Sequence, residues 1–331
     1  MSHRVVYMGT PGFAGPALEA LSRVPGVTIP LVVTQPDRPA GRGRTLQAPP
    51  IRLLADSLGL PVYQVASLKS PEQRLPIVDA QPDLIVVAAF GLILGRSILT
   101  LPPCGCLNLH ASLLPKYRGA SPISAAIHQG DQETGVTLMR MERGLDTGPM
   151  IGTIRESIRP DDTTASLTAR LANAAANVLL QHLPAILRGE APETPQPAGA
   201  TLTRPLVKAD GWIDWSRPAV EIDRHVRAMW PWPRAWTTWP DGMSFQIHEA
   251  QVETESAQLA PGQVRLDPAG LLVGCGNDRV LRVLRGQVSG GKAHDGRQLA
   301  SGPAFRADPM LGTGDAPTVP GPMIVPVDDM Q

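Results

Sequence analysis

The feature that most constrains the fold is an alternation of apolar runs with helical patterns across the first 190 residues. Nearly continuous apolar runs lie at residues 5–8, 29–34, 84–89 and 106–110, and helical patterns lie at 15–23, 51–58 and 71–80. Apolar runs without polar alternation are typical of strands buried on both faces. The sequence therefore predicts an α/β domain with a Rossmann-like, mostly parallel sheet and helices on both faces.

This first domain is expected to span residues 1–188. Two later strands are predicted at residues 135–141 and 150–154. A long helix is predicted at residues 163–187, with Asp162 or Thr163 as its N-cap and a break near its end at Pro184.

A change of pattern marks the second half of the chain. Residues 189–205 are rich in proline and polar side chains, which predicts a linker that packs as no regular element. A short helix is predicted next at 220–229, followed by strands at 235–239, 244–250, 262–266, 271–274 and 280–286. Their spacing is typical of a small OB-like β-barrel, so we expect a second domain at residues 206–311. Residues 312–331, rich in proline and glycine, predict a poorly ordered tail.

Composition excludes several classes of protein. Hydrophobic residues make up 43% of the 331, so a core can form. No apolar run reaches the roughly 18 residues that span a bilayer. The chain start leads directly into the first apolar run, so we expect no signal peptide, no membrane partner and a cytoplasmic location. Three cysteines without ligand spacing predict neither a disulfide framework nor a metal site.

Charge is balanced, with 30 basic and 30 acidic residues. Residues 1–204 hold 18 basic and 15 acidic residues, a net +3, and residues 205–331 hold 12 and 15, a net −3. A nucleic-acid partner would therefore be held by a local basic patch and not by a basic domain.

The strongest chemical signal surrounds Asn108 and His110. They lie two residues apart at the end of a predicted strand, so both side chains point to one face. Asp146 follows between two glycines, which let backbone approach a ligand closely. An amide and an imidazolium can both donate to a developing oxyanion, and a carboxylate can orient the histidine or relay a proton. No activated Ser or Cys lies beside them, which favours direct attack by an amine on an acyl carbon. Each residue alone is more often structural.

The segment Asn108-x-His110-x-Ser112-Leu113-Leu114-Pro115, followed by Asp146, resembles the signature of the folate-dependent formyltransferases. The resemblance implies that Asn108, His110 and Asp146 are catalytic and that the donor is 10-formyltetrahydrofolate, which leaves as tetrahydrofolate. It also implies a folate site formed by two segments, whose residues are Phe90, Gly91, Leu92, Ser112, Leu113, Leu114 and Pro115.

Three further stretches are most similar to the family members that formylate methionyl-tRNA. They are Met8-Gly9-Thr10-Pro11, the basic loop from Thr34 to Arg44, and the run from Ile213 through Arg227 with Pro231-Trp232-Pro233. The resemblance implies that initiator methionyl-tRNA is the partner of a monomeric enzyme. A flexible loop with spaced guanidinium groups suits a phosphate backbone. The residues expected to bind tRNA are Arg38, Arg42, Arg44, Lys208, Arg224 and Arg227.

Two other interpretations stay open. A formyltransferase acting on an amino-sugar nucleotide would use the same three residues but has no need of the basic loop. A non-catalytic nucleotide-binding module would also have a parallel sheet. The first turn, Met8 to Gly12, disfavours it because Pro11 and the spacing do not match Gly-x-Gly-x-x-Gly.

Overall fold

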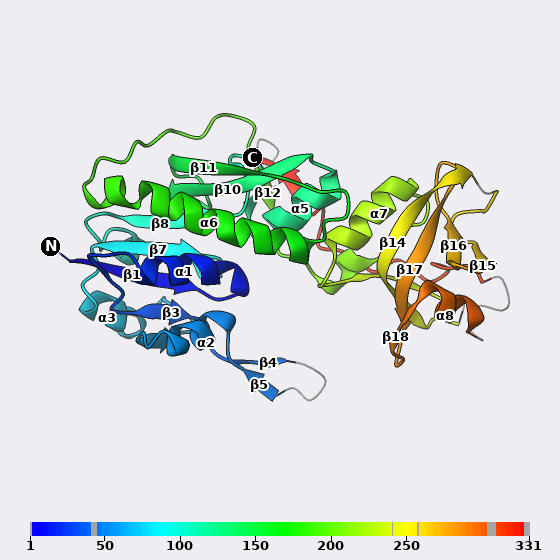
Figure 1. The fold of residues 1–331 in the computed structure, drawn as a ribbon, viewed down its shortest axis with the longest axis horizontal. Helices are drawn as coiled ribbons and strands as arrows, with labels where there is room; N and C mark the ends of the chain where they lie inside the picture. The colour runs from blue at the N-terminus through cyan, green and yellow to red at the C-terminus, as the bar shows by residue number, and fades with distance from the viewer. Residues whose placement is uncertain (1, 41–44, 240, 257, 303–308, 328–331) are drawn as a thin grey trace.

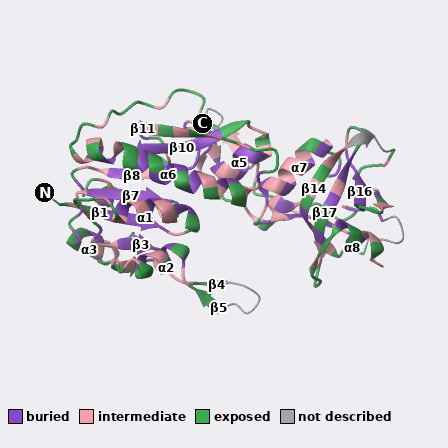
Figure 2. Cartoon of the chain, in the orientation of Figure 1, coloured by how far each residue is buried: buried purple, intermediate pink, exposed green. Residues whose placement is uncertain are grey.

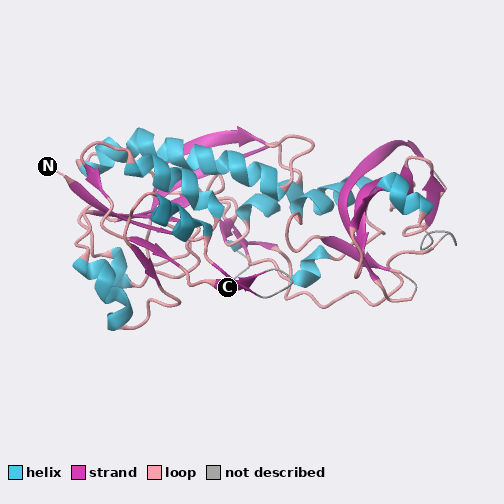
Figure 3. Ribbon diagram, turned by 60° about the horizontal axis from the view of Figure 1, so that its bottom comes forward, coloured by secondary structure: helices cyan, strands magenta, loops and turns pink. Residues whose placement is uncertain are grey.

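The chain forms two lobes joined side by side (Figures 1 and 3). The computed structural model describes residues 2–40, 45–239, 241–256, 258–302 and 309–327. The N-terminal lobe is a sheet covered by helices, and the C-terminal lobe is dominated by long, twisted antiparallel strands. The predicted fold class, an α/β domain followed by a smaller β domain, is confirmed.

The N-terminal sheet has the strand order β11-β10-β8-β7-β1-β3-β6, with β2 paired to β1. Pairs among β1, β2, β3, β6, β7 and β8 are parallel, whereas β10 pairs antiparallel with both β8 and β11. The bounds are β1 His3–Gly9, β2 Val27–Thr28, β3 Val32–Thr34, β6 Val62–Gln64, β7 Leu84–Ala88, β8 Cys106–His110, β10 Glu133–Arg140 and β11 Met150–Ser157.

Helices cover both faces of this sheet because its central strands are apolar on both sides. Val5 and Tyr7 of β1 pack with α1, α2 and α6, while Val6 and Met8 pack on the opposite face with α3 and α4. Figure 2 shows these strands as a buried layer. The helix bounds are η1 Gly12–Ala14, α1 Gly15–Ser22, α2 Pro50–Ser57, α3 Pro71–Asp79, α4 Arg96–Leu99, α5 Pro122–Gln129 and α6 Thr164–Leu187.

The long helix α6 starts where the sequence predicts it. Thr163 is the N-cap: its side chain accepts from the Ser166 backbone, and the Ser166 hydroxyl accepts from the Thr163 backbone. The predicted break at Pro184 is wrong, because α6 continues to Leu187. Proline removes only the one helical bond that its own N–H would donate, and packing of Leu183 and Ile186 into the core holds the last turn.

The linker and the tail both differ from the prediction. Linker residues form β12 (Thr201–Thr203), which pairs with β9 (Arg118–Gly119) and with β19 (Ile324–Pro326). Residues 312–331 were expected to be poorly ordered, but their described part returns to the N-terminal lobe and contributes β19. Backbone groups of these polar segments are satisfied by pairing across the chain, a contact that no local pattern signals.

The C-terminal lobe is one six-stranded antiparallel sheet with the path β13-β14-β17-β16-β15 and β18 paired to β17. Helix α7 packs against β14 and β17, and α8 against β16 and β17. The bounds are η2 Lys208–Gly211, α7 Ala219–Ala228, β13 Ala235–Thr238, β14 Ser244–Ser256, β15 Val264–Asp267, β16 Gly270–Gly274, β17 Arg279–Val288, β18 Ala293–Asp295 and α8 Gly296–Ser301.

Two histidines meet where the lobes join, since α5 of the first lobe packs on α7 of the second. The rings of His128 and His225 lie edge to face at 5.6 Å. Nδ1 of His128 and Nε2 of His225 are buried without a hydrogen-bond partner among the described residues. Burial lowers the pKa of both rings, and that of His225 falls to about 4. Arg217 and Arg224 act in the same direction on His128, whereas Glu221 and Asp210 oppose them.

We expect this junction to make the protein less stable as the pH falls. The pKa of His225 is about 4 in the folded chain and about 6.5 when unfolded, so the unfolded state binds more protons between these values. The unfolding free energy should therefore fall from pH 6.5 toward pH 4, by at most ~1.4 kcal/mol per pH unit for this histidine. Urea titrations across that range, comparing wild type with His225→Asn, measure the slope.

His225→Asn should flatten the slope, and His294→Asn serves as its control because His294 is exposed. Identical slopes in wild type and His225→Asn would show that the junction does not titrate.

Candidate active site

The site lies at the carboxyl edge of the N-terminal sheet, where strands β1, β7 and β8 end. Thr10 follows β1, Phe90 follows β7, and His110 ends β8. The Thr10 hydroxyl donates to the Phe90 carbonyl at 3.0 Å, so these strand ends are neighbours. Open α/β folds place their ligands at this edge.

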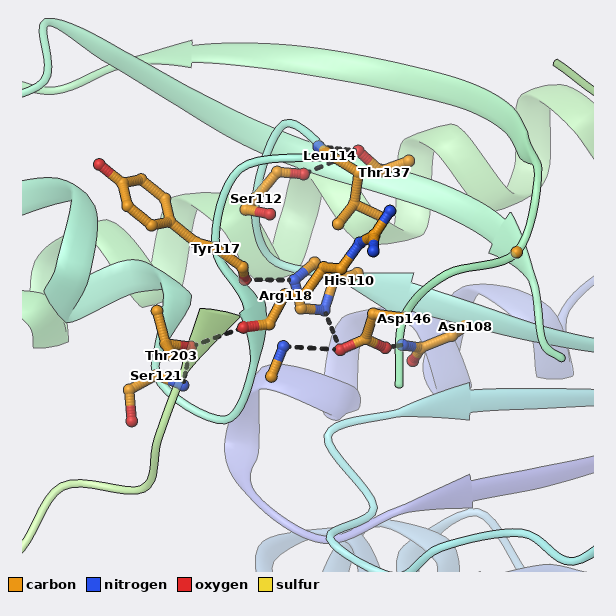
Figure 4. A network of polar contacts seen from close by, with 12 residues as sticks. Asn108, His110, Ser112, Leu114, Tyr117, Arg118, Ser121, Thr137, Asp146 and Thr203 are labelled. Carbon is orange, nitrogen blue, oxygen red and sulfur yellow. Dashed lines mark hydrogen bonds and ion pairs between the residues drawn. The ribbon is translucent and has the colours of Figure 1, made fainter. Parts of the chain in front are cut away.

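Three polar side chains converge there (Figure 4). Asn108 Nδ2 donates to Asp146 Oδ1 at 3.1 Å, and His110 Nδ1 lies 3.5 Å from Asp146 Oδ2. The Gly119 backbone N–H also donates to Oδ2, at 2.8 Å. The side chains of His110 and Asp146 are only 6% and 11% exposed, so their interaction is little screened by water. The structure thus brings together the three residues that the sequence selected.

Both ring nitrogens of His110 face acceptors inside the protein. Nε2 donates to the Tyr117 carbonyl at 2.9 Å, which requires a proton on Nε2 because a carbonyl can only accept. Nδ1 faces the Asp146 carboxylate at the longer distance of 3.5 Å. Nδ1 is therefore the nitrogen that a substrate atom can compete for.

The loop between β10 and β11 holds Asp146 in a left-handed backbone conformation, with φ at 51°. The flanking glycines are required by the turn itself. A Cβ at Gly148 would overlap the Arg140 carbonyl, and one at Gly144 would overlap the Thr147 side chain. These glycines therefore have a local packing reason, and the expectation that they open the backbone to a ligand stays a prediction.

The Ser112–Pro115 turn is fixed by hydrogen bonds to Thr137 of β10 and to the backbone that follows the turn. Thr137 donates to the Ser112 carbonyl at 2.7 Å and accepts from the Leu114 N–H at 3.2 Å. The Ser112 hydroxyl donates to the Lys116 carbonyl at 2.6 Å. Ser112 and Leu114 are buried, while Leu113 and Pro115 are partly exposed. Leu113 and Pro115 give the turn a partly exposed apolar surface.

The second predicted folate segment follows β7. The Phe90 side chain is buried, and its carbonyl accepts from Gln35 Nε2 at 2.8 Å. Gly91 is exposed with φ at 79°, and a Cβ there would overlap the Gln35 amide. Leu92 is half-buried. The accessible part of this segment is thus the Gly91 backbone and the half-buried Leu92, and its role in folate binding stays a prediction.

The residues predicted to bind tRNA are spread over both lobes. Arg38 is exposed in β4 (Arg38–Ala40), which pairs with β5 (Thr45–Gln47), and it contacts Gln35. Arg42 and Arg44 lie outside the described residues. Figure 1 shows that the β4–β5 hairpin projects from the sheet.

The predicted tRNA-binding residues of the C-terminal lobe differ in whether their side chains are already engaged by other residues. Lys208 is exposed in η2. Arg224 lies against Gly130 at the end of α5. Arg227 is used within the protein, since it pairs with Asp223 at 2.9 Å and donates to the Asp162 carbonyl at 3.0 Å. Its contact holds α7 against the start of α6, and its role toward tRNA stays a prediction.

Sequence reasoning missed several residues that shape this site. Tyr117 and Gly119 supply the backbone partners of His110 and Asp146. Thr203 of β12 accepts from the Ser121 N–H and donates to the Arg118 carbonyl, and Gln196 reaches the Asp146 loop. The last two belong to the linker, where no local pattern gives a signal.

Two features concern cofactors and membranes. Within the described ranges, no group of three or more His, Cys, Asp or Glu residues is placed to hold a metal ion. No helix in the described part of the chain is both long and apolar enough to cross a membrane.

Comparison with protein families defines the class. The formyl transferase family model matches residues 3–183, and the model of the formyl transferase C-terminal domain matches residues 205–304. The chain therefore belongs to the formyl transferase family, and it is an enzyme.

Individual relatives narrow the class further. The methionyl-tRNA formyltransferase of Paraburkholderia xenovorans (strain LB400) is 46% identical over 91% of this chain and 95% of its own length. The methionyl-tRNA formyltransferase of Methylococcus capsulatus (strain ATCC 33009 / NCIMB 11132 / Bath) is 45% identical over 94% of this chain and its entire length. A solved sugar 3N-formyl transferase, determined with dTDP and 5-N-formyl-THF, shares the fold with a TM-score of 0.64 at 13% identity, and covers 88% of this chain and 100% of its own.

Proposed function

We propose that this enzyme transfers the formyl group of 10-formyltetrahydrofolate to the free amino group of initiator methionyl-tRNA. The convergence of Asn108 and His110 on the buried Asp146 carboxylate carries the proposal for the chemistry. The acceptor is supported by relatives named methionyl-tRNA formyltransferase at about 45% identity over nearly the whole chain. The donor is supported by the apolar walls at Phe90–Leu92 and Ser112–Pro115 and by the formyl-folate in the structure with the same fold.

In the proposed reaction the amine nitrogen attacks the formyl carbon directly. A C–N bond forms to the acceptor, the electron pair moves onto the formyl oxygen, and the bond from the formyl carbon to N10 of the folate then breaks. The proton lost by the amine passes to Asp146 and then to N10 of the departing tetrahydrofolate.

Each side chain has a distinct task. Asn108 Nδ2 has a second hydrogen beyond the one given to Asp146, and it donates to the oxyanion. The Nδ1–H of His110 lies between the Asp146 carboxylate and the oxyanion and can donate to both. The Gly119 N–H and the Asn108 amide fix the carboxylate at the point where the amine loses its proton.

Several finer parts belong to the proposal. The enzyme acts as a monomer in the cytoplasm, and the reaction needs no metal ion because the amide and imidazole supply the electrostatic stabilisation. Residues 1–188 form the catalytic domain, 189–205 the linker and 206–311 the tRNA-binding domain. Arg38, Arg42, Arg44 and the C-terminal basic residues hold the tRNA phosphates.

Transfer of labelled formyl from 10-formyltetrahydrofolate tests the function. Initiator methionyl-tRNA should become labelled, and elongator methionyl-tRNA should be a poorer acceptor. A dTDP-amino sugar is the competing acceptor, and label on the sugar without label on the tRNA would assign the enzyme to the amino-sugar class.

We expect Arg42→Ala to weaken use of methionyl-tRNA by about 1–3 kcal/mol in kcat/KM, the scale of a specific arginine contact. Its sequence position between two glycines lets the guanidinium reach a groove. Wild-type kcat/KM should also fall steeply with salt, because tRNA binding releases counterions, and the variant should show a shallower slope. Steady-state formylation across a salt series measures both.

Arg23→Ala is the matched control, since this exposed arginine follows α1 at the amino edge of the sheet, away from the candidate active site at the carboxyl edge. An Arg42→Ala enzyme that keeps the wild-type kcat/KM and salt slope would remove the loop from tRNA recognition.

A further inference from the structure

One linker side chain reaches the candidate active site. Residues 192–199 are exposed except for Gln196, which is partly buried. Two residues before it, Thr194 exchanges both backbone hydrogen bonds with Met150, each at 2.8 Å. This bridge anchors the linker beside the Asp146 loop and directs Gln196 toward it.

The Gln196 amide uses all of its hydrogen-bonding capacity. Nε2 donates to the carbonyls of Asp146 and Gly148, both at 2.8 Å. Oε1 accepts from Arg118 Nε at 3.1 Å and from Arg118 Nη2 at 2.8 Å. The amide orientation is unambiguous, because carbonyls require a donor and a guanidinium requires an acceptor.

These contacts complete a hydrogen-bonded ring that contains Gln196, Arg118, Gly119 and Asp146. Arg118 precedes Gly119, whose N–H donates to Asp146 Oδ2. Gln196 therefore holds the Asp146 backbone on one side and the strand that supports its side chain on the other. Asp146 needs such support, because its φ of 51° is unfavourable for a residue other than glycine.

We propose that Gln196 is a positioning residue that sets the Asp146 carboxylate for proton transfer, an inference that rests on the proposed function. It touches neither the reacting atoms nor the walls of the folate site. Its loss should therefore lower kcat and leave KM for both substrates nearly unchanged. The linker is then part of the active-site scaffold as well as a connection between lobes.

Gln196→Glu is the sharpest test, because it keeps the size and the acceptor for Arg118 but turns an oxygen toward two carbonyls. We expect at least about a tenfold lower kcat, the effect of losing a well-aligned hydrogen bond. Protonation of the new carboxyl returns one O–H donor. The ratio of variant to wild-type kcat should therefore rise as the pH is lowered.

Gln196→Met removes both the donor and the acceptor of the amide at similar size, so kcat should fall by a similar factor. Because methionine does not titrate, the ratio of this variant's kcat to wild-type kcat should not change with pH. Gln181→Glu, a matched change on the exposed face of α6, should retain wild-type kcat. Melting temperatures of all variants show that the proteins compared are folded.

The inference is overturned if Gln196→Glu keeps kcat within about twofold of wild type. It is also overturned if the ratio of variant to wild-type kcat changes no more with pH for Gln196→Glu than for Gln196→Met. Failure of the proposed function gives a different result, since wild type itself would then label no methionyl-tRNA.

Discussion

Asp146→Asn is expected to lower kcat by about 100–1,000-fold, the range typical when one preorganised charged or hydrogen-bonding group is removed from a buried site. The carboxylate accepts from Asn108 and Gly119 and lies beside His110. An amide of the same shape must turn an NH₂ toward one of these donors, and it cannot take the proton from the amine. The KM for the folate should change little, because Asp146 is not part of the folate walls. Steady-state formylation at saturating substrates measures the loss.

Glu142→Gln is the control for this variant. Glu142 is an exposed acid in the same loop, so it tests whether removing a nearby negative charge is enough. Asn108→Ala and His110→Ala should show losses of the same order. An Asp146→Asn enzyme with more than about a tenth of wild-type kcat would exclude the carboxylate from proton transfer.

Asp162→Ala is expected to cost about 3–5 kcal/mol of unfolding free energy, the usual effect of removing one partner of a buried ion pair. The Asp162 side chain is 3% exposed and accepts from Arg170 at 2.6 and 2.7 Å. It also accepts from the Arg159 N–H and the Ser166 hydroxyl, both at 2.7 Å. Its loss would remove four hydrogen bonds at the start of α6 and leave the Arg170 guanidinium without its buried counter-charge. Urea denaturation of wild type and variant measures the difference.

The pH dependence provides a second check on Asp162. Burial alone would raise the pKa of this carboxyl, but hydrogen bonds from Arg170, Arg159 and Ser166 outweigh it and lower the pKa to about 2. The unfolded value is about 3.9, so the stabilisation is complete above that pH and is lost as the pH falls through 2.

The difference in unfolding free energy between wild type and Asp162→Ala should accordingly become smaller at low pH. The neighbouring Asp161 is exposed, and Asp161→Ala should unfold like wild type. Equal destabilisation by both substitutions would point to a general charge effect at the helix start.

The ion pair also matters for the arrangement of the lobes. The Asp162 carbonyl accepts from Arg227 of α7, and the Thr164 hydroxyl donates to the Ala228 carbonyl at 2.7 Å. The start of α6 is therefore a docking point for the C-terminal lobe. Weakening this helix start loosens a contact on which the relative position of the lobes depends.

The sequence by itself determined the order of elements in the N-terminal lobe and the nature of its sheet. The alternating burial of Val5 and Val6 on two faces follows from an apolar run, and the cap at Thr163 follows from a short motif. It also placed Asn108 and His110 on one face of β8, since side chains in a strand repeat every two residues. Such properties are local, so a pattern of a few residues is enough to predict them.

Only the tertiary structure decided how distant segments complete the site. Asp146 reaches β8 through a strained turn, and Gln196 fixes that turn from a linker that was predicted to pack as no regular element. The described tail adds β19 to the same region, and His128 meets His225 between the lobes. These contacts join residues far apart in the chain. Their partners are selected by compaction of the whole molecule and by the need of each buried polar group for a partner, which no local period or spacing records.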